Sequence, residues 1–491
     1  MKKLFLFTII SFSIFLVSNT CQAQTLEEAL GYGLPVVVVN TVNGEEPTAE
    51  RVVAPEGCMG KSIINATKVP GRVRIYNPRD AENPIFDSGE YAENISGMTF
   101  KIRGNTSAMR PKNPFKIKLQ KKADMLMRGD KKYNDKDWAL IRPTGGSKHL
   151  CPIVTMIGNK TTEILRVCDW VPACMYVNLI VNGDFRGFYL LTETVERNDK
   201  CRINVDEQTG YIAEIDPYWW NGEVNFVESP ILRNSYKFTF KYPDSDDITQ
   251  EQLDAFREHI ELLNASLTDG TYPLYIDVES CARWLLAHQL LGTLDAGGSN
   301  MFIIRRDGQS KLQMGTLWDF DSAFLIQGSF TPIMSLHYFR RMLQDSPNKL
   351  LASEMFWIWE AEKERIMTEV YDFLDSMAGT DLALAIDYST KANLNRWPGN
   401  MLDDMNTTVE NLRQWFSTRA EEIDALLGTF CSGDGMVSAK SSSKEKFFKK
   451  IVQDKHLYIV RDGETYSVDG RQIRGVESLA PISRGRALGG R

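Results

Sequence analysis

The chain has few of the side chains that usually bind transition metals. Its 491 residues include only five histidines, spread from His149 to His456, and eight cysteines, none of them in a Cys-x-x-Cys pair. Zinc sites depend on Cys and His ligands at short, regular spacing. The sequence therefore argues against a His-based metal centre and gives no indication of a zinc site.

Long apolar segments are absent after the N-terminus. Lys2 and Lys3 precede an apolar run over Leu4–Val17, and small and polar residues follow up to Cys21-Gln22-Ala23. This order is typical of a secretory signal peptide, and the run is too short to cross a bilayer. We expect cleavage after Ala23 and export to the periplasm, the cell surface or the medium. A lipid anchor on Cys21 is disfavoured because the usual apolar residue three positions earlier is missing.

An excess of basic residues is also absent. The formal net charge is −7, and it becomes −9 once Lys2 and Lys3 leave, with 55 basic residues against 64 acidic ones. This balance argues against nucleic acid as the main partner. Seven cysteines remain after cleavage, an odd number that predicts a free thiol, and Cys168 and Cys174 are near enough in sequence to be bridged. The hydrophobic content of 43% is typical of a globular protein, and the length allows two or three domains.

Strand signals dominate the first half of the chain. Asn182-Gly183 separates two apolar runs and predicts a tight hairpin turn, and Pro243-Asp244 ends the region. We expect strands at Leu34–Val39, Arg72–Tyr76, Thr99–Arg103, Tyr176–Val181, Phe185–Leu191, Tyr211–Asp216 and Lys237–Tyr242.

Helical periodicity takes over afterwards. Thr249 and Asp277 are placed to cap helices, and further helices are expected near Leu351–Met377 and Thr407–Leu427. The prediction is an α+β fold with two lobes and a cleft between them. Its expected parts are a signal peptide (1–23), a β-rich N-terminal region and N-lobe (24–244), a helical C-lobe (245–430), a linker (431–454), a short β segment (455–473) and a disordered tail (474–491).

Two basic strands form the first candidate site. Apolar and basic residues alternate on both sides of the loop 104–113, so one strand face carries Lys101, Arg103, Lys116 and Lys118. Such a face can hold a polyphosphate, with backbone N–H groups of Gly104-Asn105-Thr106 assisting. An ordinary solvated face remains an alternative.

An acidic group flanking a hairpin forms the second. Asp307-Gly308 predicts a turn between strands over Met301–Arg306 and Lys311–Leu317. Because the strands have similar lengths, Asn300 and Asp319 should meet, with Asp295 one short loop away. Carboxylate and amide oxygens suit Mg²⁺, and one carboxylate can take a proton from a hydroxyl nucleophile. A cluster of loop residues without catalytic function is the alternative.

A third candidate is Glu193, which directly follows the hairpin turned at Asn182-Gly183. A kinase-like site needs a carboxylate that holds its phosphate-binding lysine, and Glu193 is placed for that task. It is equally suited to capping or solvating the end of the hairpin.

With these residues in place, the chain resembles the CotH kinase family of atypical protein kinases. The ordered matches lie between Leu34 and Gly428: Arg103-Gly104-Asn105, Pro114 to Leu119, Val181-Asn182-Gly183 to Leu191 with Glu193, Lys241-Tyr242-Pro243, Leu294-Asp295 with Asn300, and Trp318-Asp319-Phe320-Asp321. The resemblance implies a kinase-like fold that transfers phosphate from ATP to protein Ser/Thr with Mg²⁺ or Mn²⁺.

The resemblance also implies roles for single residues. Asp295 looks like the catalytic Asp, and Asn300 and Asp319 look like metal ligands. Asp321 resembles a further metal ligand or a brace for the loop. Phosphates would be held by Arg103, by Lys116 or Lys118, and by the loop at Asn105.

Two stretches depart from the pattern or extend it. After Asp137-Trp138-Ala139-Leu140 the family usually continues with an Asp-rich segment such as Tyr-Asp-Lys-Ser, whereas this chain has Arg142-Pro143-Thr144-Gly145. The difference falls where substrate contacts are expected. The tail over Leu457–Ile473 is similar to C-terminal segments of exported Bacteroidota proteins, some of which are sorting signals.

The expected function is an exported ATP-dependent protein Ser/Thr kinase acting on a protein substrate or envelope component. The alternative is a non-catalytic cell-surface module that binds glycan or envelope protein, since ATP is scarce outside the cytoplasm. A third possibility is that Asp319 and Asp321 hold a structural Ca²⁺.

Overall fold

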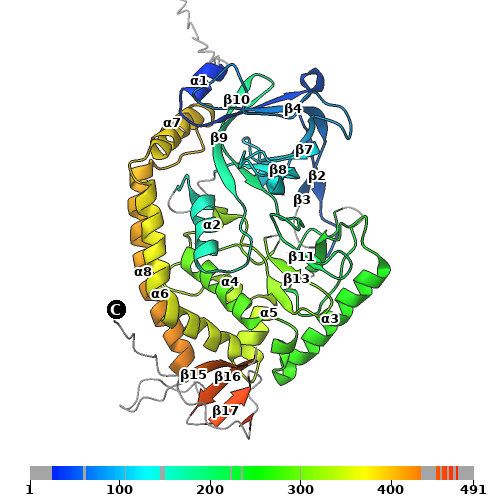
Figure 1. The fold of residues 1–491 in the computed structure, drawn as a ribbon, viewed down its shortest axis with the longest axis vertical. Helices are drawn as coiled ribbons and strands as arrows, with labels where there is room; N and C mark the ends of the chain where they lie inside the picture. The colour runs from blue at the N-terminus through cyan, green and yellow to red at the C-terminus, as the bar shows by residue number, and fades with distance from the viewer. Residues whose placement is uncertain are drawn as a thin grey trace, which may run out of the picture. The chain divides into compact units, whose positions relative to one another are not determined.

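The computed structural model describes residues 25–58, 62–105, 107–143, 150–221, 224–233, 236–298, 300–432, 449–453, 456–461, 464–467 and 472–473. The expected signal peptide and the tail after residue 473 lie outside this range. The chain divides into two compact units, Met1–Phe430 and Cys431–Arg491. Helices and strands are mixed in the first unit, which contains every candidate site residue (Figure 1).

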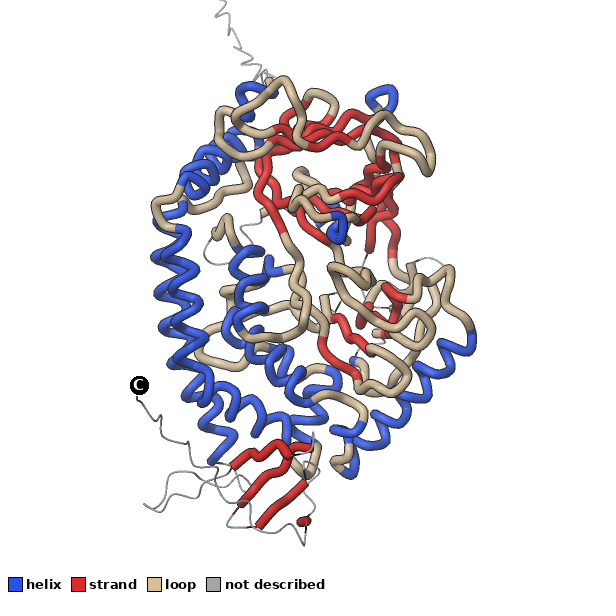
Figure 2. Tube along the Cα trace, viewed as in Figure 1, coloured by secondary structure: helices blue, strands red, loops and turns tan. Residues whose placement is uncertain are grey.

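An eight-stranded sheet occupies the N-terminal part of the first unit (Figure 2). The strand order is β1-β9-β10-β8-β7-β6-β4-β5, and β1 also pairs with β4, so the sheet closes on itself. Only β1 and β9 pair in parallel among these strands. The bounds are β1 Val36–Thr41, β4 Val69–Tyr76, β5 Phe86–Asp87, β6 Met98–Ile102, β7 Phe115–Ala123, β8 Asp135–Ile141, β9 Cys174–Val181 and β10 Asp184–Glu193.

Alternation along these strands explains the closed sheet. One side chain in two is apolar and points inward, where Phe100, Ile117 and Trp138 are fully buried in one core. The predicted turn is confirmed, because Asn182 and Gly183 both have positive φ, as a two-residue hairpin turn requires. Closure through β1 was not predicted, since it depends on pairings between residues far apart in sequence.

A four-stranded sheet follows, in the order β12-β11-β13-β14. Its strands are β11 Tyr211–Asp216, β12 Lys237–Tyr242, β13 Phe302–Arg305 and β14 Leu312–Met314. The last two form the predicted hairpin, shorter than expected at both ends. A separate pair, β2 Ala49–Val53 and β3 Ser62–Ala66, completes the strands of this unit.

The helices are α1 Leu26–Leu30, α2 Val154–Ile164, α3 Gln250–Asp269, α4 Val278–Leu291, α5 His337–Arg340, α6 Leu350–Met377, α7 Asp381–Arg396 and α8 Met405–Ser432. Both predicted caps are confirmed, because Thr249 and Asp277 accept hydrogen bonds from the first turns of α3 and α4. The long helices α6 and α8 lie side by side (Figure 1), and Trp359 Nε1 donates to Asp424 at 2.7 Å. No helix among the described residues has the length and apolarity needed to span a membrane.

The second unit contains a four-stranded sheet of β15 Lys449–Gln453, β16 His456–Arg461, β17 Glu464–Ser467 and β18 Gln472–Ile473. A short β segment over 455–473 was expected here, and β15 lies within the segment expected to be a linker. The sequence also predicts turns at Asp462-Gly463 and Asp469-Gly470, which lie outside the described residues. In the first unit Cys168 and Cys174 are free thiols, so the suggested bridge between them was wrong.

Candidate active site

A pocket lies where the closed sheet, α2 and the segment after β14 meet. It is lined by Arg103, Ser107 and Pro114 at one end of β6 and β7, by Ile141 and Arg142 at the end of β8, by Thr192 of β10, by Val154, Thr155 and Asn159 of α2, and by Trp318, Asp319, Phe320 and Asp321.

The backbone at Asp319 is held in a sparsely populated conformation. Its φ is 60° and its ψ is 80°, just before the 3₁₀ helix η6 over Phe320–Ser322. A non-glycine residue at positive φ costs about 1–3 kcal/mol and persists only where its surroundings fix it. Here the Phe320 ring lies so close to Gly158 of α2 that any side chain at position 158 would collide with it. Contact with α2 therefore positions Asp319.

Asp295 is tied to the same segment. Its backbone N–H donates to Ser322 Oγ at 3.0 Å, and Leu294 N–H donates to the Ser322 carbonyl at 3.0 Å. Asp295 is exposed, yet partial loss of hydration within the site raises its pKa, and the negative charge of Asp319 raises it further. The structure thus brings together the Asp295 loop and Asp319, which the hairpin argument expected to converge.

Asp321 adds a third carboxylate. Burial raises its pKa to about 7, the charge of Asp319 contributes next, and Arg142 opposes the shift. Asp321 is half-buried and Asp319 is exposed, and two neighbouring carboxylates that repel each other are stabilised by a divalent cation, which accepts oxygen ligands. The donor set of Asp319 and Asp321 therefore fits Mg²⁺ or Mn²⁺.

Arg103 brings positive charge to the pocket from the basic strand face. Its guanidinium lies 5.6 Å from the centre of the Trp318 ring. Burial lowers the pKa of Arg103, whereas the charges of Asp319 and Glu214 oppose this effect. A cationic segment and an anionic segment far apart in sequence thus share one pocket.

The two candidate lysines lie elsewhere on that face. Lys101 and Lys116 are cross-strand neighbours, which confirms that β6 and β7 share a basic face. However, Lys116 Nζ is 2.6 Å from Asp137 Oδ1 and 3.6 Å from Glu196 Oε1. Lys118 is exposed, and neither lysine is among the residues that line the pocket.

Comparison with known proteins identifies a family. A family model described as CotH kinase protein matches residues 100–423. The chain belongs to the CotH kinase family. Among solved structures, the chain is similar to the Helicobacter pylori proinflammatory kinase CtkA at 11% identity, with a TM-score of 0.26 over 63% of this chain and 95% of that one. No curated protein matches the chain.

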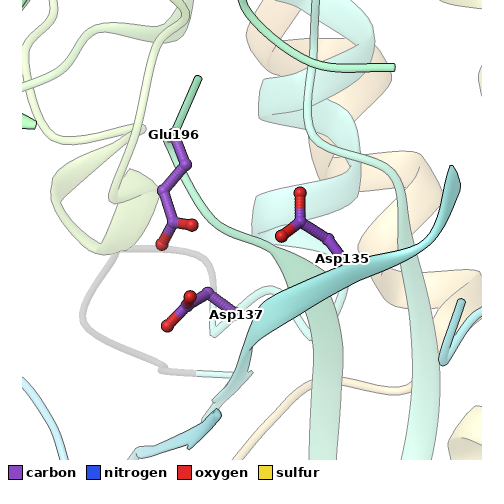
Figure 3. Close-up of side chains that lie close together, drawn as sticks. All are labelled: Asp135, Asp137 and Glu196. Atoms are coloured by element: carbon purple, nitrogen blue, oxygen red, sulfur yellow. The ribbon is translucent and has the colours of Figure 1, made fainter. Parts of the chain in front are cut away.

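A second group of acids lies on the outer face of the sheet, beside Lys116. The carboxylates of Asp135, Asp137 and Glu196 point toward one another (Figure 3), and one oxygen from each lies within 4.8 Å of the others. Burial raises the pKa of Glu196 to about 7, with the charge of Asp137 adding to it. We call these three residues the acidic cluster.

Cations already neutralise the acidic cluster. Besides Lys116, the buried Arg202 places Nε 3.4 Å from Asp135 Oδ2 and Nη1 3.8 Å from Glu196 Oε2. Asn198 Nδ2 also donates to Asp135 Oδ2 at 2.9 Å. Ion pairs at these distances favour a structural network over a metal site.

Glu193 does not hold a lysine in this CotH protein, contrary to the prediction. Its Oε1 is 2.9 Å from Arg128 Nη2, and its Oε2 accepts from Ala173 N–H at 3.0 Å. The carboxylate that holds Lys116 is Asp137, because β8 lies next to β7 in the sheet. A pairing between strands this distant could not be read from local sequence.

Three further predicted residues are not among those that line the pocket: Asp295, Asn105 and Asn300. Asn105 is half-buried in the loop after β6, directly after Gly104, and Thr106 lies outside the described residues. Asn300 stands at the base of the hairpin just before β13. Among lining residues, Arg142 and Asn159 were not predicted. The departure of Arg142 from the CotH pattern was the one signal that pointed to this position.

Proposed function

We propose that the protein is an exported CotH-type kinase that transfers the γ-phosphate of ATP to Ser or Thr of a protein, with Mg²⁺ or Mn²⁺. The observation that carries this proposal is the pocket in which Arg103 faces Asp319 and Asp321, with Asp295 tied to the same segment. Phosphoryl transfer depends mainly on positioning and on neutralising phosphate charge, and this arrangement supports both.

Each residue has a role in this proposal. Asp295 accepts the proton of the acceptor hydroxyl, and its raised pKa makes it more basic than an ordinary Asp. Asp319 and Asp321, with Asn300, would hold the metal, which neutralises phosphate charge when bound. Arg103 binds phosphate oxygens from the opposite side. The closed sheet and the helical half that follows it would act as the two lobes of a kinase-like fold.

The proposed cellular setting rests on sequence features at the two ends of the chain. The basic and apolar N-terminus supports export to the periplasm, cell surface or medium, and the tail supports an origin in the Bacteroidota. A protein of the envelope or of the surroundings is then the expected substrate.

The test is a comparison of Asp295→Ala with wild type. Loss of the general base should lower γ-phosphate transfer to a generic protein acceptor by roughly 100- to 10,000-fold, while Mg-ADP still binds. Asp372→Ala, which removes an exposed carboxylate of α6, should change neither quantity. Unchanged transfer by Asp295→Ala would refute the catalytic role. A wild-type protein that binds no ATP with Mg²⁺ or Mn²⁺ would favour a non-catalytic binding module.

A further inference from the structure

The pocket contains a second guanidinium group that no family role accounts for. Arg142 directly follows β8 and lines the pocket together with Arg103, Asp319 and Asp321. Its Nε atom is buried and has no hydrogen-bond partner within the described part of the chain. A buried donor without a partner is costly, so a ligand that accepts a hydrogen bond from Arg142 would remove this cost.

The neighbouring cations are already paired. Lys116 is held by Asp137, Arg128 by Asp124 and Glu193, and Arg202 by Asp135. In contrast, no described carboxylate lies within ion-pair distance of Arg142 or Arg103. These two arginines are therefore the cations of the pocket whose donors are available to an anion.

The surroundings of Arg142 favour the binding of an anion. Burial has the largest effect and lowers the pKa of its guanidinium. The charge of Asp321 raises that pKa, and the charge of nearby Arg110 lowers it. The side chain thus loses hydration without gaining an ion pair. An anion with several oxygens would replace the lost hydration and supply the missing ion pair, because the planar guanidinium donates to phosphate oxygens in pairs.

We infer that Arg142 is a second phosphate-binding residue, which together with Arg103 grips the phosphate groups of a nucleoside di- or triphosphate opposite Asp319 and Asp321. This inference rests on the proposed function and extends it. It assigns Arg142 to binding and not to proton transfer. It also explains why this chain can differ from the family pattern at this position and keep a nucleotide site.

The test is calorimetric titration of the full chain with Mg-ADP, Mg-pyrophosphate and adenosine. Arg142→Gln should weaken both phosphate ligands by roughly tenfold or more, since charge-assisted hydrogen bonds to phosphate are lost. Its affinity for adenosine should equal that of wild type. Arg142→Lys, which keeps the charge and loses the fork, should show an intermediate loss for the phosphate ligands.

Arg110→Gln is the matched control. Arg110 is exposed, acts on Arg142 through its charge, and does not line the pocket. Its removal should change affinity by less than about threefold, because salt screens exposed charges. Circular dichroism of each variant confirms folding, and Arg142→Lys serves if Arg142→Gln does not fold.

The outcomes separate the inference from the proposed function. A wild-type protein that does not bind Mg-ADP would refute the proposed kinase function. Normal binding by wild type together with equal binding by Arg142→Gln would overturn the role of Arg142 alone. Equal losses for adenosine and for Mg-ADP would also overturn it, because they would mean that Arg142 acts through the fold. A loss with Mg-ADP but none with Mg-pyrophosphate would show that its partner is not phosphate.

Discussion

Two groups of carboxylates in this protein look alike by proximity and differ in their surroundings. The acidic cluster of Asp135, Asp137 and Glu196 brings its oxygens within 4.8 Å of one another. The pocket carboxylates, Asp319 and Asp321, repel each other in a similar way, and each group contains one acid whose pKa is raised to about 7. By closeness alone, the acidic cluster is the better metal site.

The cations around each group favour the pocket carboxylates as the metal site. Lys116 and Arg202 lie at ion-pair distance from the acidic cluster, so its charge is neutralised within the protein. The pocket carboxylates line the same pocket as Arg103 and Arg142 and have no ion pair with either among the described residues. A closed network stabilises the fold, whereas charges separated by a pocket can be bridged by a metal and a polyphosphate. Neutralisation is thus a better guide to a binding site than the spacing of acids.

The largest expected effect comes from exchanging one acid in each group. Asp319→Asn should weaken Mg-dependent ADP binding by about 100-fold or more, because a direct metal ligand is lost. Asp137→Asn should leave that affinity within about threefold, since the acidic cluster does not contact the nucleotide. Calorimetric titration with ADP, with and without Mg²⁺, measures the affinity of each variant. Equal losses in the two variants would remove the distinction between the groups.

The contact that positions Asp319 gives the second prediction. Gly158→Ala should destabilise the protein by about 1–3 kcal/mol, because the new methyl group collides with Phe320. It should also lower phosphoryl transfer by displacing Asp319, while leaving the acidic cluster intact. Urea unfolding and a transfer assay give the two readouts.

The control is Gly428→Ala in α8, where an added Cβ meets nothing within 4 Å. That change should stabilise the protein by about 0.5–1 kcal/mol through helix propensity. A Gly158→Ala protein as stable and as active as wild type would contradict the proposed packing of α2 against η6.

The third prediction removes one cation from the ion-pair network of the acidic cluster. Lys116→Ala leaves Asp137 without its cation and should cost about 1–2 kcal/mol of unfolding free energy, because the pair is partly screened by solvent. Lys118→Ala, on the same strand face and exposed, should cost less than about 0.5 kcal/mol. If Lys116→Ala kept full stability and lost ADP binding, Lys116 would be a phosphate ligand, as its sequence position first suggested.

The smallest effect concerns pH. The folded protein raises the pKa of Glu196 from 4.5 to about 7, so it binds more protons than the unfolded chain between these values. The stability contributed by Glu196 is therefore present at pH 4.5 and lost as the pH rises through 7. Glu196→Gln should gain melting temperature relative to wild type between pH 5 and pH 8. A difference independent of pH would show that Glu196 titrates normally.

Much of this arrangement follows from local sequence. Alternation at Lys101 and Lys116 predicted a shared basic face, and Asp307-Gly308 predicted the hairpin that brings the Asp295 loop toward Asp319. Thr249 and Asp277 predicted two helix starts. In each case the information lies within a few residues.

The rest depends on contacts between distant segments. Pairing of β8 with β7 brings Asp137 to Lys116, and Arg128 rather than a lysine reaches Glu193. The helix α2 was not assigned, although it forms one wall of the pocket and fixes Phe320. Periodicity reports which face of a strand is apolar, and it does not report which strand lies alongside.

The most direct test of the central claim is a crystal structure of the protein with ADP and Mn²⁺, with the metal located by its anomalous scattering. The account predicts an anomalous peak bound by Asp319 and Asp321, with the ADP phosphates between that metal and the guanidinium groups of Arg103 and Arg142. A manganese ion held by Asp135, Asp137 and Glu196, with ADP outside the pocket, would contradict it.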